Sequence, residues 1–296
     1  MVLTVVVSLL AAVLFGTAMV LQHRGANRVR RRFPLHPGLL HDLARQKWWL
    51  LGSAVEAAAV ILHVVAVNVG PLSVVQPLMT VGLLVALPLQ ALLGRPIGRG
   101  SYVAAALTVT GLAMFVGTHP AGRSPSMATT ADWPPGLLFV GAVAVAVLVV
   151  ALSQRGVARS LGLGAAAGAL FALTAGLAKT WGALLYGGGI AAVASSWQLW
   201  TAVAASLAGT MLSQAAFQAG ALGPVLAATM VADPVVGVSL GMIVFDEHLA
   251  AGPLVILQGA GLLLTLVGVW RLATTESTQA ILRAADDHYR SSALNP

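Results

Sequence analysis

Long apolar stretches recur along almost the whole chain, and they constrain its fold more than any other feature. A transmembrane α-helix needs about 20 predominantly apolar residues to cross the hydrocarbon of a bilayer. Nine stretches have this character: 2–22, 48–66, 72–93, 101–118, 135–152, 161–186, 197–218, 224–245 and 252–271. Only 8% of the 296 residues are charged, too few to solvate the surface of a water-soluble domain. The sequence therefore predicts an all-α polytopic membrane protein with nine transmembrane helices.

The basic residues are distributed unevenly between the connections. Of the 16 Lys and Arg residues, 14 lie in segments on one side of the membrane, many in the run HRGANRVRRR at 23–32. Because positively charged loops stay in the cytoplasm, we expect the N-terminus outside and the C-terminus inside, in a bacterial inner membrane. We interpret the run as a topology signal that contacts anionic lipid headgroups, and not as a nucleic-acid site. We do not expect the first stretch to be a signal peptide, because the arginines follow it.

The two halves of the sequence resemble each other weakly. VNVGPLSVVQPL at 67–78 and AGALGPVLAATMVADPV at 219–235 each contain a Gly-Pro step and then a polar-Pro pair inside an apolar stretch. One additional linker helix would invert the second copy, which is an architecture of alternating-access transporters. We expect one transmembrane domain over 1–271, made of repeat one at 2–118, a linker helix at 135–152 and repeat two at 161–271, and then a short cytoplasmic tail at 272–296.

Two acidic residues, Glu56 and Asp233, lie inside apolar stretches. A charged side chain at the centre of a bilayer costs about 2.5–3.5 kcal/mol on insertion scales, so each acid is a candidate for a substrate or ion path. Pro234 has no N–H and leaves the carbonyl of Met230 without its helical partner. An acid beside a free carbonyl suits a cation, so both acids are candidate metal ligands. In the alternative, Asp233 is protonated or bonded to a neighbouring hydroxyl at an ordinary proline kink.

Three interior polar features extend this candidate path. Gln76 and Pro77 are the counterpart of the Asp-Pro pair in the first half, and Gln214 adds a second interior amide. Glutamines inside membrane proteins also form hydrogen bonds between helices without a further role. Lys179 could extend to the membrane interface or neutralise one of the interior acids.

Two further residues are weaker candidates. His63 follows Glu56 by seven residues, so the two share a helix face. Glu247 belongs to the short polar group DEH just beyond the eighth apolar stretch. We expect that group to be a solvated loop.

Three segments resemble the drug/metabolite transporter superfamily: KWWLLGSAVEAAAVILHVVAVNVGPLSVVQPL (47–78), FALTAGLAKTWGALL (171–185) and SQAAFQAGALGPVLAATMVADPVVGVSLGMIVFDEHL (213–249). The branch that they resemble most is that of the nine-helix, NIPA-like magnesium transporters. Within that pattern, the matching residues are Pro77, Lys179, Pro234 and Glu247. The chain departs from it at Glu56, about a turn farther from the Gly-Pro step, at Ala59 in place of an asparagine, and at GRPIGR in place of an acid after the third helix.

These observations favour a secondary transporter and leave its cargo open. A divalent cation such as Mg²⁺ is one hypothesis, a small organic solute is a second, and a non-transporting membrane subunit is a third. The sequence has no Gly-rich phosphate loop, no HExxH and no convincing Ser/His/Asp pattern, so we expect neither an enzyme nor a resident cofactor. Small residues at 164, 168, 172 and 176 predict close helix packing, within one subunit or in a homodimer.

Overall fold

The structure, a computed structural model, describes residues 2–26, 28–29, 37–92, 99–118, 128–219 and 222–293. Every regular element within these residues is a helix, and none is a strand, as the sequence predicts. The basic run at 23–32 and the GRPIGR segment lie partly outside the described residues.

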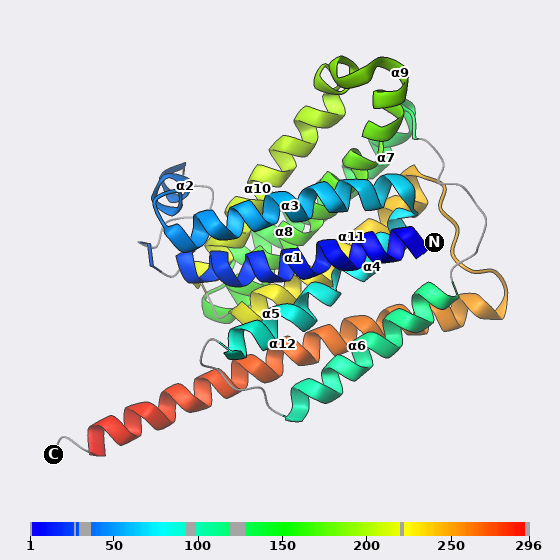
Figure 1. Cartoon of the computed structure of the whole chain (residues 1–296). Coiled ribbons are helices and arrows are strands. Elements are labelled where there is room, and N and C mark those ends of the chain that lie inside the picture. Colours follow the sequence, from blue (N-terminus) through cyan, green and yellow to red (C-terminus); the bar gives the residue numbers. More distant parts are fainter. Residues whose placement is uncertain are drawn as a thin grey trace.

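Figure 1 shows the order and arrangement of the helices. They are α1 Val2–Ala26, α2 Pro37–Leu43, α3 Lys47–Val69, α4 Leu72–Met79, α5 Val81–Leu92, α6 Arg99–Gly117, the 3₁₀ turn η1 Thr130–Asp132, α7 Trp133–Ser153, α8 Gly156–Lys179, α9 Trp181–Ala194, α10 Trp197–Ala219, α11 Leu222–Val244 and α12 Pro253–Ala293.

Six of the described helices are long and apolar enough to cross a bilayer, and α9 with α10 adds a seventh span if that pair, bent by 65°, is taken together. The tandem α4–α5 and helix α6 are apolar but shorter in their described parts. The chain is therefore a multi-pass helical membrane protein, and its described residues contain about six or seven spans of full length.

Three boundaries differ from the expected stretches. The stretch 161–186 is interrupted after Lys179, because Thr180 separates α8 from α9. The stretch 72–93 is two helices, since the chain breaks at Thr80, three residues after the helix-interior Pro77. Helix α12 runs past the expected end of the last apolar stretch at residue 271 and continues into the expected tail as far as Ala293.

Helices α8 and α11 form the enclosed centre of the molecule. Within their spans 67% and 61% of the residues are buried, against 33% or less in the other four full-length spans. Helix α8 packs on α10, α11 and α7, while α1 packs on α3 and on the α4–α5 tandem. Helices α6 and α12 lie side by side (Figure 1). Asp233 therefore lies on one of the two most enclosed helices.

Small residues allow these close helix contacts. A Cβ atom on Gly261 of α12 would lie 2.7 Å from the amide nitrogen of Phe115 on α6, so only glycine fits there. The expected stripe on α8 behaves in the same way, because a Cβ on Gly164 would lie 2.9 Å from the carbonyl oxygen of Val225 on α11. The stripe is thus used for packing within one subunit.

Candidate functional site

A cavity of about 130 Å³ lies between helices from both halves of the chain. Helices α1, α3 and α4 of the first half line it together with α8, α9, α10 and α11 of the second half. Its polar lining residues are Glu56, His63, Thr174, Ser206, Thr229 and Asp233. Both interior acids predicted from the sequence therefore line the same cavity.

Asp233 enters the cavity from α11 and is directly followed by the buried Pro234. Its Oδ1 atom is buried and has no hydrogen-bond partner among the described residues. Gly168 of α8 faces this point, and a Cβ atom there would lie 2.6 Å from the carbonyl oxygen of Thr229. The two helix backbones thus approach closely beside Asp233. A buried acceptor without a donor lowers the stability of the fold. Oδ1 of Asp233 can therefore still accept a hydrogen bond from a ligand.

Glu56 reaches the cavity from α3 and already has a partner. The side-chain amide of Gln22 on α1 donates to its Oε2 at 2.6 Å. The amide of Gln214 on α10 in turn donates to Oε1 of Gln22 at 2.9 Å. The three residues form a chain of hydrogen bonds that connects the two halves.

Gln22 is a site residue that the sequence reasoning missed. It ends the first apolar stretch and precedes the basic run, so it was read only as a helix boundary. Its only signal is an amide side chain at the last position of that apolar stretch. Gln214 lies behind the cavity and supports Glu56 through Gln22, since it is fully buried and absent from the lining.

His63 lines the cavity on the same helix as Glu56, as their spacing predicts. Its ring packs edge-on against Phe15, with 5.9 Å between the ring centroids. Its Nδ1 atom is buried and has no partner within the described part of the chain.

Gln76 and Pro77 do not line the cavity. Both are fully buried in α4, and the Gln76 side chain packs at Gly237 of α11. Neither polar atom of the Gln76 amide has a hydrogen-bond partner in the described structure. This residue therefore contributes to the contact between the halves and lies outside the lining expected for it.

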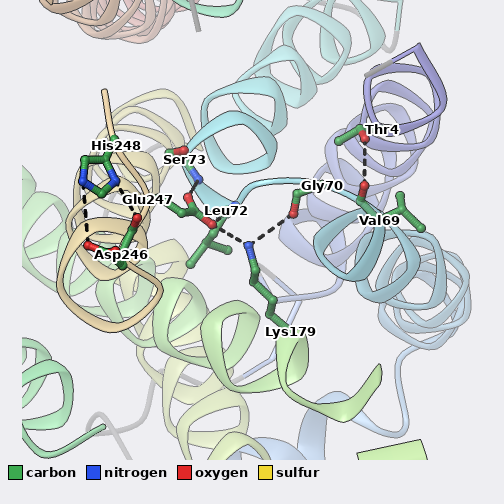
Figure 2. A network of polar contacts seen from close by, with 9 residues as sticks. All are labelled: Thr4, Val69, Gly70, Leu72, Ser73, Lys179, Asp246, Glu247 and His248. Carbon is green, nitrogen blue, oxygen red and sulfur yellow. Dashed lines mark hydrogen bonds and ion pairs between the residues drawn. The ribbon is translucent and has the colours of Figure 1, made fainter. Parts of the chain in front are cut away.

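Lys179 and Glu247 form a buried ion pair near the junction of α3 and α4 (Figure 2). Their side chains are only 4% and 5% exposed. The expectations that Lys179 reaches the interface or neutralises an interior acid, and that Glu247 belongs to a solvated loop, were wrong. Asp246 and His248 are exposed, whereas Glu247 points inward between them.

Glu247 also accepts hydrogen bonds from the first turn of α4 (Figure 2). The amides of Leu72 and Ser73 donate to its two carboxylate oxygens, each at 2.8 Å. Free amides at a helix N-terminus, together with the helix dipole, favour an anion at this place. Lys179 donates in addition to the carbonyl oxygen of Gly70 at 3.3 Å. One ion pair thus ties the ends of α8 and α11 to the α3–α4 junction.

The local chain geometry aims Glu247 inward. Asp246 has a left-handed backbone conformation with φ of 49°, which reverses the chain after α11. The Glu247 amide then donates to the carbonyl oxygen of Gly241 at 2.9 Å. Gly241 lacks a side chain where the Glu247 carboxylate lies, and a Cβ atom there would contact it.

Aromatic residues surround the ion pair. The Lys179 ammonium lies 4.8 Å from the ring centroid of Phe245, and Phe245 packs edge-on against the buried Trp133 at 5.9 Å. Trp133 packs in the same way on Trp197 at 6.0 Å. Burial raises the pKa of Glu247, but the Lys179 charge and the hydrogen bonds from Lys179 and Ser73 outweigh burial and hold this pKa below its ordinary value of 4.5.

In the described part of the chain, no three His, Cys, Asp or Glu residues lie close enough together to hold a metal ion. Glu56 and Asp233 share the cavity lining, but they are two carboxyl groups without a third such ligand beside them.

Enclosed polar residues on a bundle of apolar spans define the class of protein: a multi-pass helical membrane protein with an interior site. No family model matches the chain, and no solved structure gives a significant match. An uncharacterized protein of Corynebacterium glutamicum is 31% identical over 282 residues, covering 94% of this chain and 97% of the relative. The chain belongs to the family of that protein.

Proposed function

We propose that the protein is a secondary transporter of the drug/metabolite transporter type that moves a small solute by alternating access. The observation that carries this proposal is the cavity, because helices of both halves enclose it and two acids face into it. Substrate sites at the interface between repeats are the common arrangement in such transporters. An interior acid in a membrane protein is a functional candidate by default.

The packing of the helices supports two inverted repeats. Helix α1 packs on α3 and on the α4–α5 tandem, and α8 packs correspondingly on α10 and α11. The last helices of the two halves, α6 and α12, pack on each other. With α7 as the linker, α4–α5 as one broken span and α10 as a span that follows α9 on the outer side, the chain would cross the membrane nine times. The charge bias supports an orientation with the N-terminus outside, and the membrane that we propose is a bacterial inner membrane.

At one end of the cavity, hydrogen bonds and an ion pair connect the ends of neighbouring helices. Asn68 at the end of α3 donates to the carbonyl oxygen of Ala178 at 3.1 Å and accepts from the amide of Gly182 at 2.9 Å. The Lys179–Glu247 pair forms a second tie beside it. Ala178 and Trp181 line the cavity, so both ties lie at that end, which the proposed topology makes the outer end. These ties would break when the transporter opens outward.

The chain is well suited to a test of alternating access, because it has no cysteine. A Ser206→Cys variant places a single thiol in the cavity lining. In oriented membrane vesicles, a membrane-impermeant maleimide added to either side should label it. Glu247→Gln in this background should increase labelling from the outer side, since the outer tie is weakened. Labelling that is confined to one side in both backgrounds would contradict the proposal.

Two matched controls calibrate the sides of the membrane. Ser153 at the end of α7 and Ser195 at the end of α9 are both exposed. In the proposed topology, Ser153→Cys reacts only from the cytoplasmic side and Ser195→Cys only from the outside. The reverse pattern would invert the assigned orientation without affecting the cavity.

Mg²⁺ is the second candidate cargo, because Glu56 and Asp233 line the same cavity. Magnesium is bound through one or two carboxylates and keeps several of its waters. Proteoliposomes with a magnesium-sensitive dye inside and a pH dye in parallel test this candidate. Magnesium entry that Asp233→Asn abolishes would support it. A substrate-triggered proton signal without magnesium entry would support an organic solute, and variants of both acids that keep every cellular phenotype would indicate a non-transporting subunit.

A further inference from the structure

We infer that the cavity binds a monovalent organic cation about the size of one ring, with its ammonium group on Asp233 and its apolar body among aromatic side chains. The inference rests on the proposed transport function for its role in the cell. Binding itself can be measured without transport.

The charged groups at the cavity determine the sign of the ligand. Glu56 and Asp233 line it, whereas no Lys or Arg is among the described lining residues. The nearby Lys179 is already paired with Glu247. The site therefore favours a cation over an anion.

The two acids differ in what they can still bind. Glu56 accepts a short hydrogen bond from Gln22, so part of its capacity is used. Asp233 has a buried oxygen that no described residue bonds. A buried acceptor without a donor costs about 1–3 kcal/mol, and a donor on the ligand would remove this penalty. Asp233 is thus the primary contact for the ammonium group.

Aromatic and methionine side chains make up much of the remaining wall. Phe15, Phe171 and Trp181 contribute rings from three different helices, and Met19, Met79 and Met230 contribute flexible thioethers. Aromatic faces attract ammonium groups, and methionine adapts to irregular apolar shapes. This wall solvates an apolar ligand body, but it offers few oxygen atoms to replace the water around a metal ion.

The size of the cavity limits the ligand further. A cavity of about 150 Å³ in another protein holds one benzene molecule. The present cavity, at about 130 Å³, is similar. A single-ring ammonium compound fits both the volume and the charge.

The test uses the full-length protein in lipid nanodiscs and a matched pair of probes. Benzylammonium and benzyl alcohol have the same ring and length, but only the first carries a charge. By isothermal titration calorimetry, benzylammonium should bind at least about tenfold more tightly than benzyl alcohol. Asp233→Asn should remove that difference, and Glu56→Gln should reduce it less. Asp132→Asn changes an exposed acid outside the cavity and should leave it unchanged.

Equal binding of the two probes would overturn the inference, as would unchanged benzylammonium binding in Asp233→Asn or its displacement by Mg²⁺. A second measurement avoids the acid variants, in case they do not fold. In Ser206→Cys, benzylammonium should slow maleimide labelling and benzyl alcohol should not. Equal labelling rates with both probes would also overturn it.

The outcomes separate this inference from the proposed function. If Ser206→Cys is labelled from both sides but benzylammonium does not bind, the ligand class is wrong and alternating access stands. If benzylammonium binds but the thiol is reached from one side only, the binding site stands and the transport proposal fails.

Discussion

Asp233 and Glu247 belong to the same segment of chain, yet their carboxyl groups differ in the partners that the fold gives them. Glu247 accepts from Lys179 and from two backbone amides at the start of α4. Asp233, 14 residues earlier on α11, has an oxygen without any partner among the described residues. A buried charge is tolerated when it is paired and hydrogen-bonded, and it is expensive when it is not.

The difference separates a structural role from a binding role. Glu247 connects helix ends through its ion pair, so its removal should lower the stability of the fold. Asp233 does not connect helices in this state, so its removal should weaken ligand binding more than it lowers stability. The predictions below test this contrast, in decreasing order of their expected effect on stability.

The largest loss is expected for Glu247→Gln. Removing one partner of a buried ion pair leaves the other charge uncompensated, which costs about 3–5 kcal/mol. Thermal unfolding in detergent should show a clear drop in Tm. The neighbouring Asp246→Asn is the matched control, because Asp246 is exposed and asparagine tolerates its left-handed conformation.

The double variant Lys179→Met/Glu247→Gln sharpens this result. It removes both charges, so it should be more stable than either single variant. A double variant whose loss equals the sum of the two single losses would show that the pair is not coupled.

The same pair predicts a pH dependence. The pKa of Glu247 is lower in the folded protein than its ordinary value of 4.5. Its contribution to stability is therefore complete above that value and is lost as the pH falls through the folded pKa. The Tm of the wild type, minus that of Glu247→Gln, should shrink on acidification from about pH 6 to 3. A constant difference would contradict a charged Glu247.

An intermediate loss is expected for Gln22→Ala. The substitution leaves the Gln214 amide and Glu56 without the partner that connects them. Each buried polar group left unpaired costs about 1–3 kcal/mol. Gln154→Ala, at an exposed position after α7, is the control and should change Tm little. If both variants behave alike, the hydrogen-bond chain adds nothing to stability.

The smallest change in stability is expected for Asp233→Asn. Because Oδ1 of Asp233 has no partner to lose, the free energy of unfolding should change by less than about 1 kcal/mol. The preference for benzylammonium over benzyl alcohol should nevertheless be lost. A loss of stability comparable to that of Glu247→Gln would remove the contrast between the two acids.

Much of the fold follows from composition and periodicity. The apolar stretches predict the helices, because backbone groups inside a bilayer must bond within their own segment. The interruptions were harder to predict. Pro77 was identified as a helix-interior proline, but the break at Thr80 and the separation of α8 from α9 depend on how these ends pack.

The candidate site was predicted in part. An ionisable residue stands out in an apolar stretch, which identified Glu56, His63 and Asp233, and all three line the cavity. Gln76 and Gln214 stand out equally but lie outside the lining, because their positions on the helix surface face other helices. Gln22 does not stand out, since it lies where the first apolar stretch meets the polar residues His23 and Arg24.

The sequence by itself determined that this protein is a helical membrane protein with ionisable groups in its interior, because the need to bury apolar residues and to bond the backbone acts locally. Only the tertiary structure decided which groups meet. Lys179 pairs with Glu247 across 68 residues, and Gln214 bonds Gln22 across 192. Such contacts depend on the rotation and close approach of whole helices, which glycines such as Gly168 and Gly261 permit. That packing pairs Glu247 with Lys179 between helix ends, and it leaves Oδ1 of Asp233 without a hydrogen-bond partner among the described residues.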